Sequence, residues 1–227
     1  MADAFEHRAV LTGDIIGSSR LTSPRRKLLY ESFAFLSNAL QERYPREIPY
    51  SISNFRGDSW QIVCSQPRKA LEVGLFIRTY LRFTFKSEKL DTRLAIGIGS
   101  ITFIPPENIS AGDGEAFTLS GHLLDGMESG RMAIALPEGS DPVVSTALAS
   151  LVSLLDYLPS SWSASQAQAV FWSLHGYKQE EIAGHWQPAP ITQASVSAIL
   201  KKAGWPLVKK SLSAFEILIA ALEEGNL

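Results

Sequence analysis

The sequence predicts an α/β (α+β) protein, a ferredoxin-like palm followed by a small all-α helix-turn-helix domain. Three observations support this. Short apolar runs alternate with amphipathic segments over the first 137 residues, the residues after 160 show helical spacing alone, and residues 137–142 between them are rich in turn formers. We therefore expect a palm over residues 1–137, a linker helix over 138–160 and a helix-turn-helix over 161–227.

The palm is expected to run strand, helix, strand, strand, helix, strand, helix, strand, at residues 9–19, 24–44, 50–56, 60–64, 67–85, 91–103, 115–127 and 132–136. The first run is uninterrupted and ends in small residues, which is typical of a strand buried on both faces. Ser23 is the expected N-cap of the first helix, with Pro24 as its first residue. Gly57-Asp58 is expected to turn a β-hairpin. Such a sheet is expected to carry its helices on one face.

Composition excludes several classes of protein. With 227 residues, 45% hydrophobic and 19% charged, the chain is neither collagen-like nor disordered in bulk, and the single cysteine, Cys64, allows no internal disulfide. A polar N-terminus and the lack of a run of about 20 apolar residues predict neither a signal peptide nor a membrane helix. We expect a cytoplasmic protein that does not enter a membrane. The net charge of -2 does not decide whether nucleic acid is a partner, because lysines cluster locally.

Two carboxylates form the most informative pair. Asp14 ends the first strand and Asp58 lies at the tip of the hairpin, and these two ends are neighbours in the predicted sheet. Adjacent carboxylates disfavour mutual ionisation unless a cation lies between them, and oxygen ligands suit Mg²⁺ or Mn²⁺. The simpler alternative is that both residues serve turns or caps.

The loop after Asp14 is a candidate phosphate site. It leads into a helix N-terminus, where backbone N–H groups are available to an anion. The residues predicted to bind the phosphates of a nucleotide are Ile16, Gly17, Ser18, Ser19 and Arg20.

Three blocks of the palm resemble the catalytic domain of class III nucleotidyl cyclases, in the family order: Gly13-Asp14-Ile15-Ile16-Gly17-Ser18, Arg56-Gly57-Asp58-Ser59-Trp60 and Arg93-Leu94-Ala95-Ile96-Gly97-Ile98-Gly99. The whole chain, with Gly112-Asp113-Gly114-Glu115-Ala116-Phe117 and its C-terminal region, more closely resembles the SatD family, which pairs a cyclase-like domain with a helix-turn-helix.

The resemblance implies a role for three residues. Asp14 and Asp58 match the metal carboxylates of the cyclases, and Ile15 matches the position whose backbone carbonyl binds the metal. A nucleotide of the ATP or GTP class is the implied partner. The cyclase Asn and Arg that stabilise the developing phosphate charge correspond to Phe117 and Gly121, and losing such donors costs orders of magnitude in rate. No catalytic residue is therefore assigned.

The C-terminal segment predicts helices at residues 163–174, 178–183 and 191–202 and a last helix around residues 215–222, with a turn at Gly176-Tyr177. The helix at 191–202 resembles the recognition helix of sigma-factor region 4 and related regulators. Its outward residues are expected to contact double-stranded DNA, with hydroxyl and amide side chains at base edges and lysines at phosphates. The predicted DNA-binding residues are Thr192, Gln193, Ser195, Ser197, Lys201 and Lys202. The alternative is a helical module for protein interaction or homodimerisation.

Three functions follow from these features. The leading hypothesis is a DNA-binding transcriptional regulator with a catalytically degenerate, nucleotide-binding and metal-binding palm. The second is an active nucleotidyl cyclase or nucleotidyltransferase. The third is a structural dimer that binds no ligand.

Overall fold

The computed structural model describes residues 7–55 and 57–223, so Arg56 of the predicted hairpin lies outside the described residues. The strands are β1 (Arg8–Ile16), β2 (Ser53–Phe55), β3 (Ser59–Cys64), β4 (Asp91–Gly99) and β5 (Met132–Ala135). The helices are α1 (Ser23–Arg43), α2 (Ala70–Thr84), α3 (Glu115–Asp125), α4 (Pro142–Ser161), α5 (Ala164–His175), α6 (Gln179–Gly184), α7 (Gln193–Lys202) and α8 (Trp205–Glu223). Short 3-10 turns lie at Ser18–Arg20, Pro67–Lys69 and Ile109–Ala111.

The five strands form one sheet in the order β2-β3-β1-β4-β5. β1 pairs antiparallel with both β3 and β4, and β5 is parallel to β4. A β-α-β-β-α-β chain with this strand order has the ferredoxin-like topology, so the predicted α+β class is confirmed. The strand predicted to reach residue 103 ends at Gly99, and Phe103 instead forms an isolated bridge with Asp113.

The expectation that the helices cover one face of the sheet is wrong. α1 and α2 pack on one face, whereas α3 packs on the other, where the Thr12 and Ser120 hydroxyls are hydrogen-bonded at 2.8 Å. Gly97 permits this contact, because a Cβ there would lie 2.4 Å from the Ala116 carbonyl oxygen. β1 is buried on both sides, so each face of the sheet requires its own helical layer.

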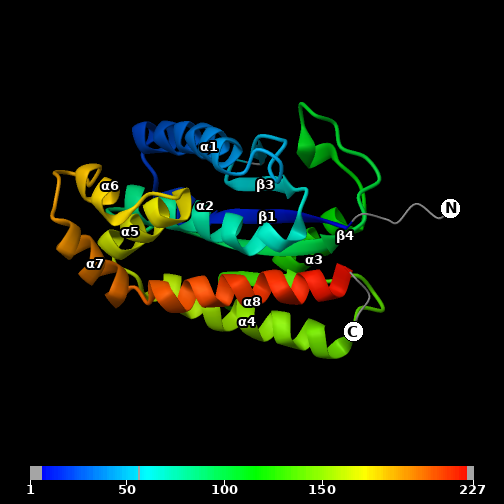
Figure 1. The fold of residues 1–227 in the computed structure, drawn as a ribbon. Helices are drawn as coiled ribbons and strands as arrows, with labels where there is room; N and C mark the ends of the chain where they lie inside the picture. The colour runs from blue at the N-terminus through cyan, green and yellow to red at the C-terminus, as the bar shows by residue number, and fades with distance from the viewer. Residues whose placement is uncertain (1–6, 56, 224–227) are drawn as a thin grey trace.

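The C-terminal helices pack against the palm (Figure 1). α4 lies along β5 and α2, α8 lies beside α4, and α5 packs on α2 through Phe76 and Phe171, whose ring centroids are 4.7 Å apart. One hydrophobic cluster runs from Leu11 in β1 to Phe215 in α8. The four predicted C-terminal helices are present, and the division at residues 137 and 160 into separate domains stays a prediction.

Two helices bear directly on the sequence predictions. α1 starts at Ser23 with Thr22 as its N-cap residue, one position earlier than predicted. α4 is long and apolar enough to cross a membrane by length and composition, with a mean hydropathy of 1.4. Its Val144, Leu148 and Val152 side chains are buried in the core, whereas Val143, Leu154 and Tyr157 are exposed.

Candidate palm site and C-terminal surface

The sheet brings Asp14 and Asp58 to the same place in the palm. Asp14 is the register partner of Ser59, and the Ile15 N–H donates to the Asp58 carbonyl at 3.1 Å. The two acids therefore extend from neighbouring strand ends. This is the juxtaposition that the order of the elements predicts.

Each carboxylate has a partner within the protein. The Arg93 guanidinium binds both oxygens of Asp14, with Nε at 3.0 Å from Oδ1. These hydrogen bonds raise the pKa of Arg93. The Ser18 hydroxyl donates to Oδ2 of Asp58 at 2.8 Å, so the loop after β1 is tied to the hairpin tip.

Gly13 allows Trp60 of β3 and the Arg93 backbone of β4 to lie close to the end of β1. A Cβ at this residue would lie 2.4 Å from the Trp60 indole and 2.6 Å from the Arg93 carbonyl oxygen. The indole N–H donates to the Thr92 hydroxyl at 2.9 Å, and that hydroxyl is 2.7 Å from the Asp14 carbonyl oxygen, to which it donates. Gly13 and Trp60 therefore fix the backbone that carries Asp14.

The predicted phosphate loop is a tight turn. Gly17 has a left-handed φ of 84°, and the Arg20 side chain folds back over it, 2.3 Å from where a Cβ would lie. The Arg20 N–H already donates to the Gly17 carbonyl at 3.1 Å. Burial declines along the loop, and its last residues, Ser19 and Arg20, are exposed.

The donor set at this end of the sheet fits a hard divalent cation. Two carboxylates and the Ile15 carbonyl supply oxygen atoms, the ligands that Mg²⁺ and Mn²⁺ prefer. A cation at Asp14 has to compete with Arg93, which already neutralises that carboxylate. Among residues 7–55 and 57–223, no cluster of three or more His, Cys, Asp or Glu side chains is placed to hold a metal.

A hollow of about 340 Å³ opens beside Asp14 and contains two arginines that the sequence analysis missed. Arg93 and Arg131 line it together with Ile15, Ile16, Met127 and the acids Asp14 and Glu128. Arginine pairs well with phosphate, so these two residues join the candidate site. The Arg93 block was visible in the sequence, but the register that pairs Arg93 with Asp14 was not.

The two positions that differ from the cyclase pattern have different surroundings. Phe117 packs on the sheet face covered by α3 and contacts Gly112, where a Cβ would lie 2.4 Å from the Phe117 ring. A Cβ at Gly121 would meet no atom of the described residues within 4 Å, so a side chain there has open space. Neither residue supplies a donor to the hollow beside Asp14.

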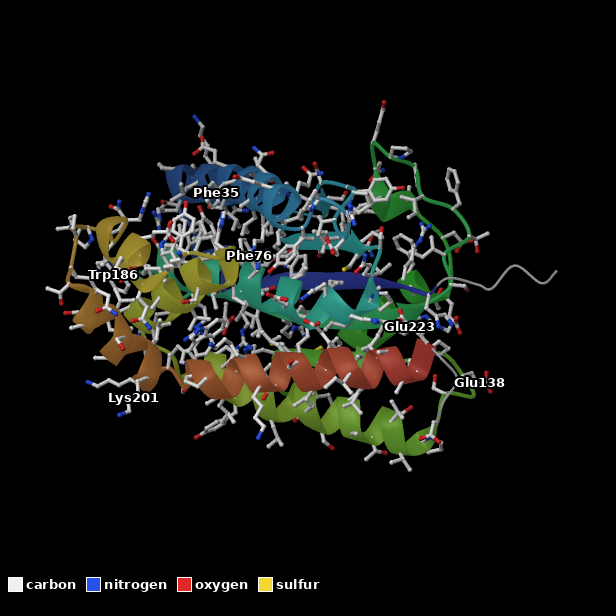
Figure 2. The ribbon with its side chains drawn as sticks, in the orientation of Figure 1. Phe35, Phe76, Glu138, Trp186, Lys201 and Glu223 are labelled. Carbon is white, nitrogen blue, oxygen red and sulfur yellow. The ribbon has the colours of Figure 1, made fainter. Side chains whose placement is uncertain are left out.

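The predicted DNA-contacting residues lie together on α7 or at its start, and all are exposed: Thr192, Gln193, Ser195, Ser197, Lys201 and Lys202. Two of them also serve the fold. Thr192 is the N-cap and accepts from the Ser195 N–H at 3.1 Å, and the Gln193 amide donates to Gln179 of α6 at 2.8 Å. Figure 2 shows Lys201 extending from α7 at the outer end of the molecule.

The fold and the paired strand ends define an α+β protein with a ferredoxin-like palm and helical C-terminal region. The sequence matches the SatD family over residues 9–211, so the chain belongs to the SatD family and the resemblance predicted from its motifs is confirmed. No curated protein matches the chain.

Solved structures similar to part of this chain include three cyclases. The adenylyl cyclase CyaB from P. aeruginosa is 17% identical with a TM-score of 0.42, over 57% of this chain and 76% of that one. The guanylyl cyclase Cya2 is 16% identical with a TM-score of 0.40, over 57% and 74%. A bacterial light-regulated adenylyl cyclase is 14% identical with a TM-score of 0.40, over 57% of this chain and 42% of that one.

Proposed function

We propose that the protein is a cytoplasmic DNA-binding regulator whose palm binds a nucleoside triphosphate with Mg²⁺ or Mn²⁺ and whose C-terminal helices bind double-stranded DNA. One observation carries this proposal. Three consecutive residues of β4 connect the candidate site to the C-terminal helices. Thr92 and Arg93 contact Asp14. Asp91 accepts from Arg82 of α2, which also donates to the Trp162 carbonyl just before α5.

The first step concerns the candidate nucleotide site. Arg93 neutralises Asp14 in the absence of a cation. A divalent cation held by Asp14 and Asp58 would replace Arg93 as the partner of Asp14 and leave its guanidinium available to phosphates in the adjacent hollow, which Arg131 also lines. Metal, carboxylates and arginines would together bind a triphosphate.

The second step links β4 to the recognition helix. Asp91 accepts from Arg78 at 2.8 Å and from Arg82 at 2.7 Å, and Arg82 donates to the Trp162 carbonyl at 2.9 Å. The Trp162 indole N–H donates to the Ala203 carbonyl, directly after α7, at 2.9 Å. These polar contacts form a continuous path from β4 to the end of α7, and the proposal requires that a shift of β4 at Arg93 be transmitted along it.

A second link runs through α4. The buried Asp156 carboxylate accepts from the Arg78 guanidinium and, at 2.7 Å, from the Arg131 N–H. Arg131 itself lines the hollow beside Asp14. Regulation requires that the nucleotide bind more tightly to one of two arrangements of these contacts, because a ligand shifts an equilibrium only by its differential affinity.

The presence of Phe117 and Gly121 supports a palm that binds a nucleotide without cyclising it. Neither side chain can donate to a developing phosphate charge, and preorganised donors of that kind account for large rate effects. We expect no cyclic or linked nucleotide after incubation with ATP or GTP and Mn²⁺. Chromatographic detection of such a product would make the protein an active cyclase or nucleotidyltransferase.

Thermal unfolding of the full chain tests the palm site. ATP or GTP at about 100 times its Kd, with Mn²⁺, should stabilise the protein by about 2.7 kcal/mol. Asp58→Asn should greatly reduce this shift, while Glu107→Gln, which changes an exposed carboxylate outside the site, should retain it. An equal shift in the Asp58 variant would refute the metal site.

Fluorescence anisotropy with random-sequence duplex DNA tests the other half of the proposal. The double variant Lys201→Ala, Lys202→Ala should bind more weakly than wild type and show a flatter dependence on salt. Nucleotide with Mn²⁺ should change the DNA affinity of the wild type but not that of Arg82→Gln. No measurable duplex binding by the wild type would assign the C-terminal helices to protein interaction instead.

A further inference from the structure

A second hollow, of about 580 Å³, lies within the C-terminal helices. Residues of α5, α6, α7 and α8 line it, together with the turn that joins α5 to α6. This volume falls within the range of about 300–1,000 Å³ that is usual for small-molecule sites. The hollow is separate from the palm site and shares no lining residue with the hollow beside Asp14.

All the charged side chains that line this hollow are positive. Lys178 from the start of α6, Lys201 from α7 and Lys209 from α8 line it, and its lining contains no Asp or Glu. Within the described part of the chain, none of the three ammonium groups has a carboxylate partner within 4.0 Å. Three uncompensated cations around a concave surface favour an anion, and a phosphate monoester carries a charge of about -1.5 to -2 near neutral pH.

The same hollow also has apolar walls. Tyr177, Leu200, Trp205 and Pro206 supply apolar and aromatic surface. The Lys209 ammonium lies 5.9 Å from the centroid of the Trp205 ring, so the cationic and aromatic parts of the hollow adjoin each other. A ligand that uses both parts has an anionic head and a flat apolar body.

We infer that this hollow binds a small organic phosphate with an aromatic body, of the size of a nucleoside monophosphate. Its lysines hold the phosphate, with the Ser197 hydroxyl as an additional donor, and the Trp205 side packs against the base. A phosphate of duplex DNA would use the lysines but not the aromatic wall. Ser197 and Lys201 belong to α7, so the bound ligand would occupy part of the surface predicted to contact DNA.

Isothermal titration of the full chain with AMP, inorganic phosphate and adenosine tests this inference. Buffer with EDTA excludes metal-dependent binding in the palm. We expect AMP to bind at least tenfold more tightly than either of the other two, because only AMP uses the lysines and the aromatic wall together. Trp205→Leu should weaken AMP binding and leave the affinity for inorganic phosphate unchanged.

The chain offers matched lysine controls. Lys201→Gln and Lys209→Gln should each weaken AMP binding about 3- to 10-fold. Lys202→Gln and Lys210→Gln change the neighbouring exposed lysines, which do not line the hollow, and should bind AMP as the wild type does. Circular dichroism checks that each variant is folded.

Three results would overturn the inference. Equal losses in all four lysine variants would indicate a diffuse surface charge, and equal affinities for AMP and inorganic phosphate would exclude the aromatic contact. Loss of AMP binding in Asp58→Asn, measured in EDTA, would place the ligand in the palm. The inference depends on neither the palm site nor DNA binding, so either part of the proposed function can fail without it.

Discussion

Arg93 and Asp14 are register partners across β4 and β1, and the Arg93 guanidinium binds both oxygens of the Asp14 carboxylate. The sequence predicts a metal cation beside Asp14, and in the structure the positive charge beside this carboxylate is the Arg93 guanidinium. Because both groups are only partly buried, this pair is not needed for folding in the way a core ion pair is. Under the proposed function, a bound metal would replace this contact.

Replacing Arg93 by Gln should therefore separate metal binding from nucleotide binding. Without the competing guanidinium, Mn²⁺ alone should bind at least as tightly as in the wild type, whereas the triphosphate should bind about tenfold more weakly because a charged phosphate contact is lost. Electron paramagnetic resonance of free Mn²⁺ and titration with ATP measure the two quantities. Parallel losses of both affinities would mean that Arg93 supports the site only structurally.

The buried pair between Asp91 and Arg78 should dominate the acid stability of the palm. Burial by itself would raise the pKa of Asp91, but hydrogen bonds and charge from Arg78 and Arg82 outweigh it and leave that pKa lowered. The carboxylate therefore stabilises the fold above its unfolded-state pKa of about 3.9, and this contribution is lost as the pH falls through the lower folded-state pKa.

Asp91→Asn should thus reduce the free energy of unfolding at pH 7 by about 1–3 kcal/mol, because Arg78 then keeps only Asp156 as a carboxylate partner and Arg82 loses Asp91. The difference from the wild type should shrink as the pH falls below about 4. Urea unfolding at a series of pH values on either side of that unfolded-state pKa of about 3.9 measures it. Glu107→Gln is the exposed control, and a gap of constant size at all pH values would contradict the assignment.

Gly97 of β4 and Gly121 of α3 should respond oppositely to alanine. At Gly97 a Cβ would lie 2.4 Å from a carbonyl oxygen and 2.5 Å from a backbone nitrogen of α3, so Gly97→Ala should destabilise the protein by about 1–3 kcal/mol. At Gly121 the same atom meets open space, and Gly121→Ala should stabilise the helix by about 0.5–1 kcal/mol. Urea titrations of both variants give the values; similar effects would mean that α3 does not pack closely on β4.

The thiol of Cys64 should be unreactive in the folded protein. Burial raises its pKa to about 12, against the weaker opposing effect of its hydrogen bond to the Gln66 carbonyl. The reactive thiolate is therefore scarce near neutral pH, and the side chain is inaccessible. A disulfide-exchange reagent should label the native chain slowly and the urea-unfolded chain rapidly. Fast labelling of the native chain would show that β3 opens readily.

Local patterns predicted most elements because each depends on neighbouring residues. β4 begins at Asp91 as expected, and α5 lies where the helix over residues 163–174 and the turn at Gly176 were predicted, with a capping box at Ser163. The predictions failed where distant segments decide the outcome. The apolar run after Gly99 continues the strand pattern, but it pairs with the segment at Asp113 instead of extending β4.

The sequence by itself determined the order of strands and helices, because periodicity and turn residues fix it, and its motifs carried the resemblance to the SatD family. The order of the elements also placed the strand ends that carry Asp14 and Asp58 side by side. Only the tertiary structure decided that α3 covers the second face of the sheet and that Arg93 is the partner of Asp14. It also decided that Lys178, Lys201 and Lys209 line one hollow. These are contacts between residues far apart in the chain, which depend on strand register and helix packing, and no local pattern encodes either.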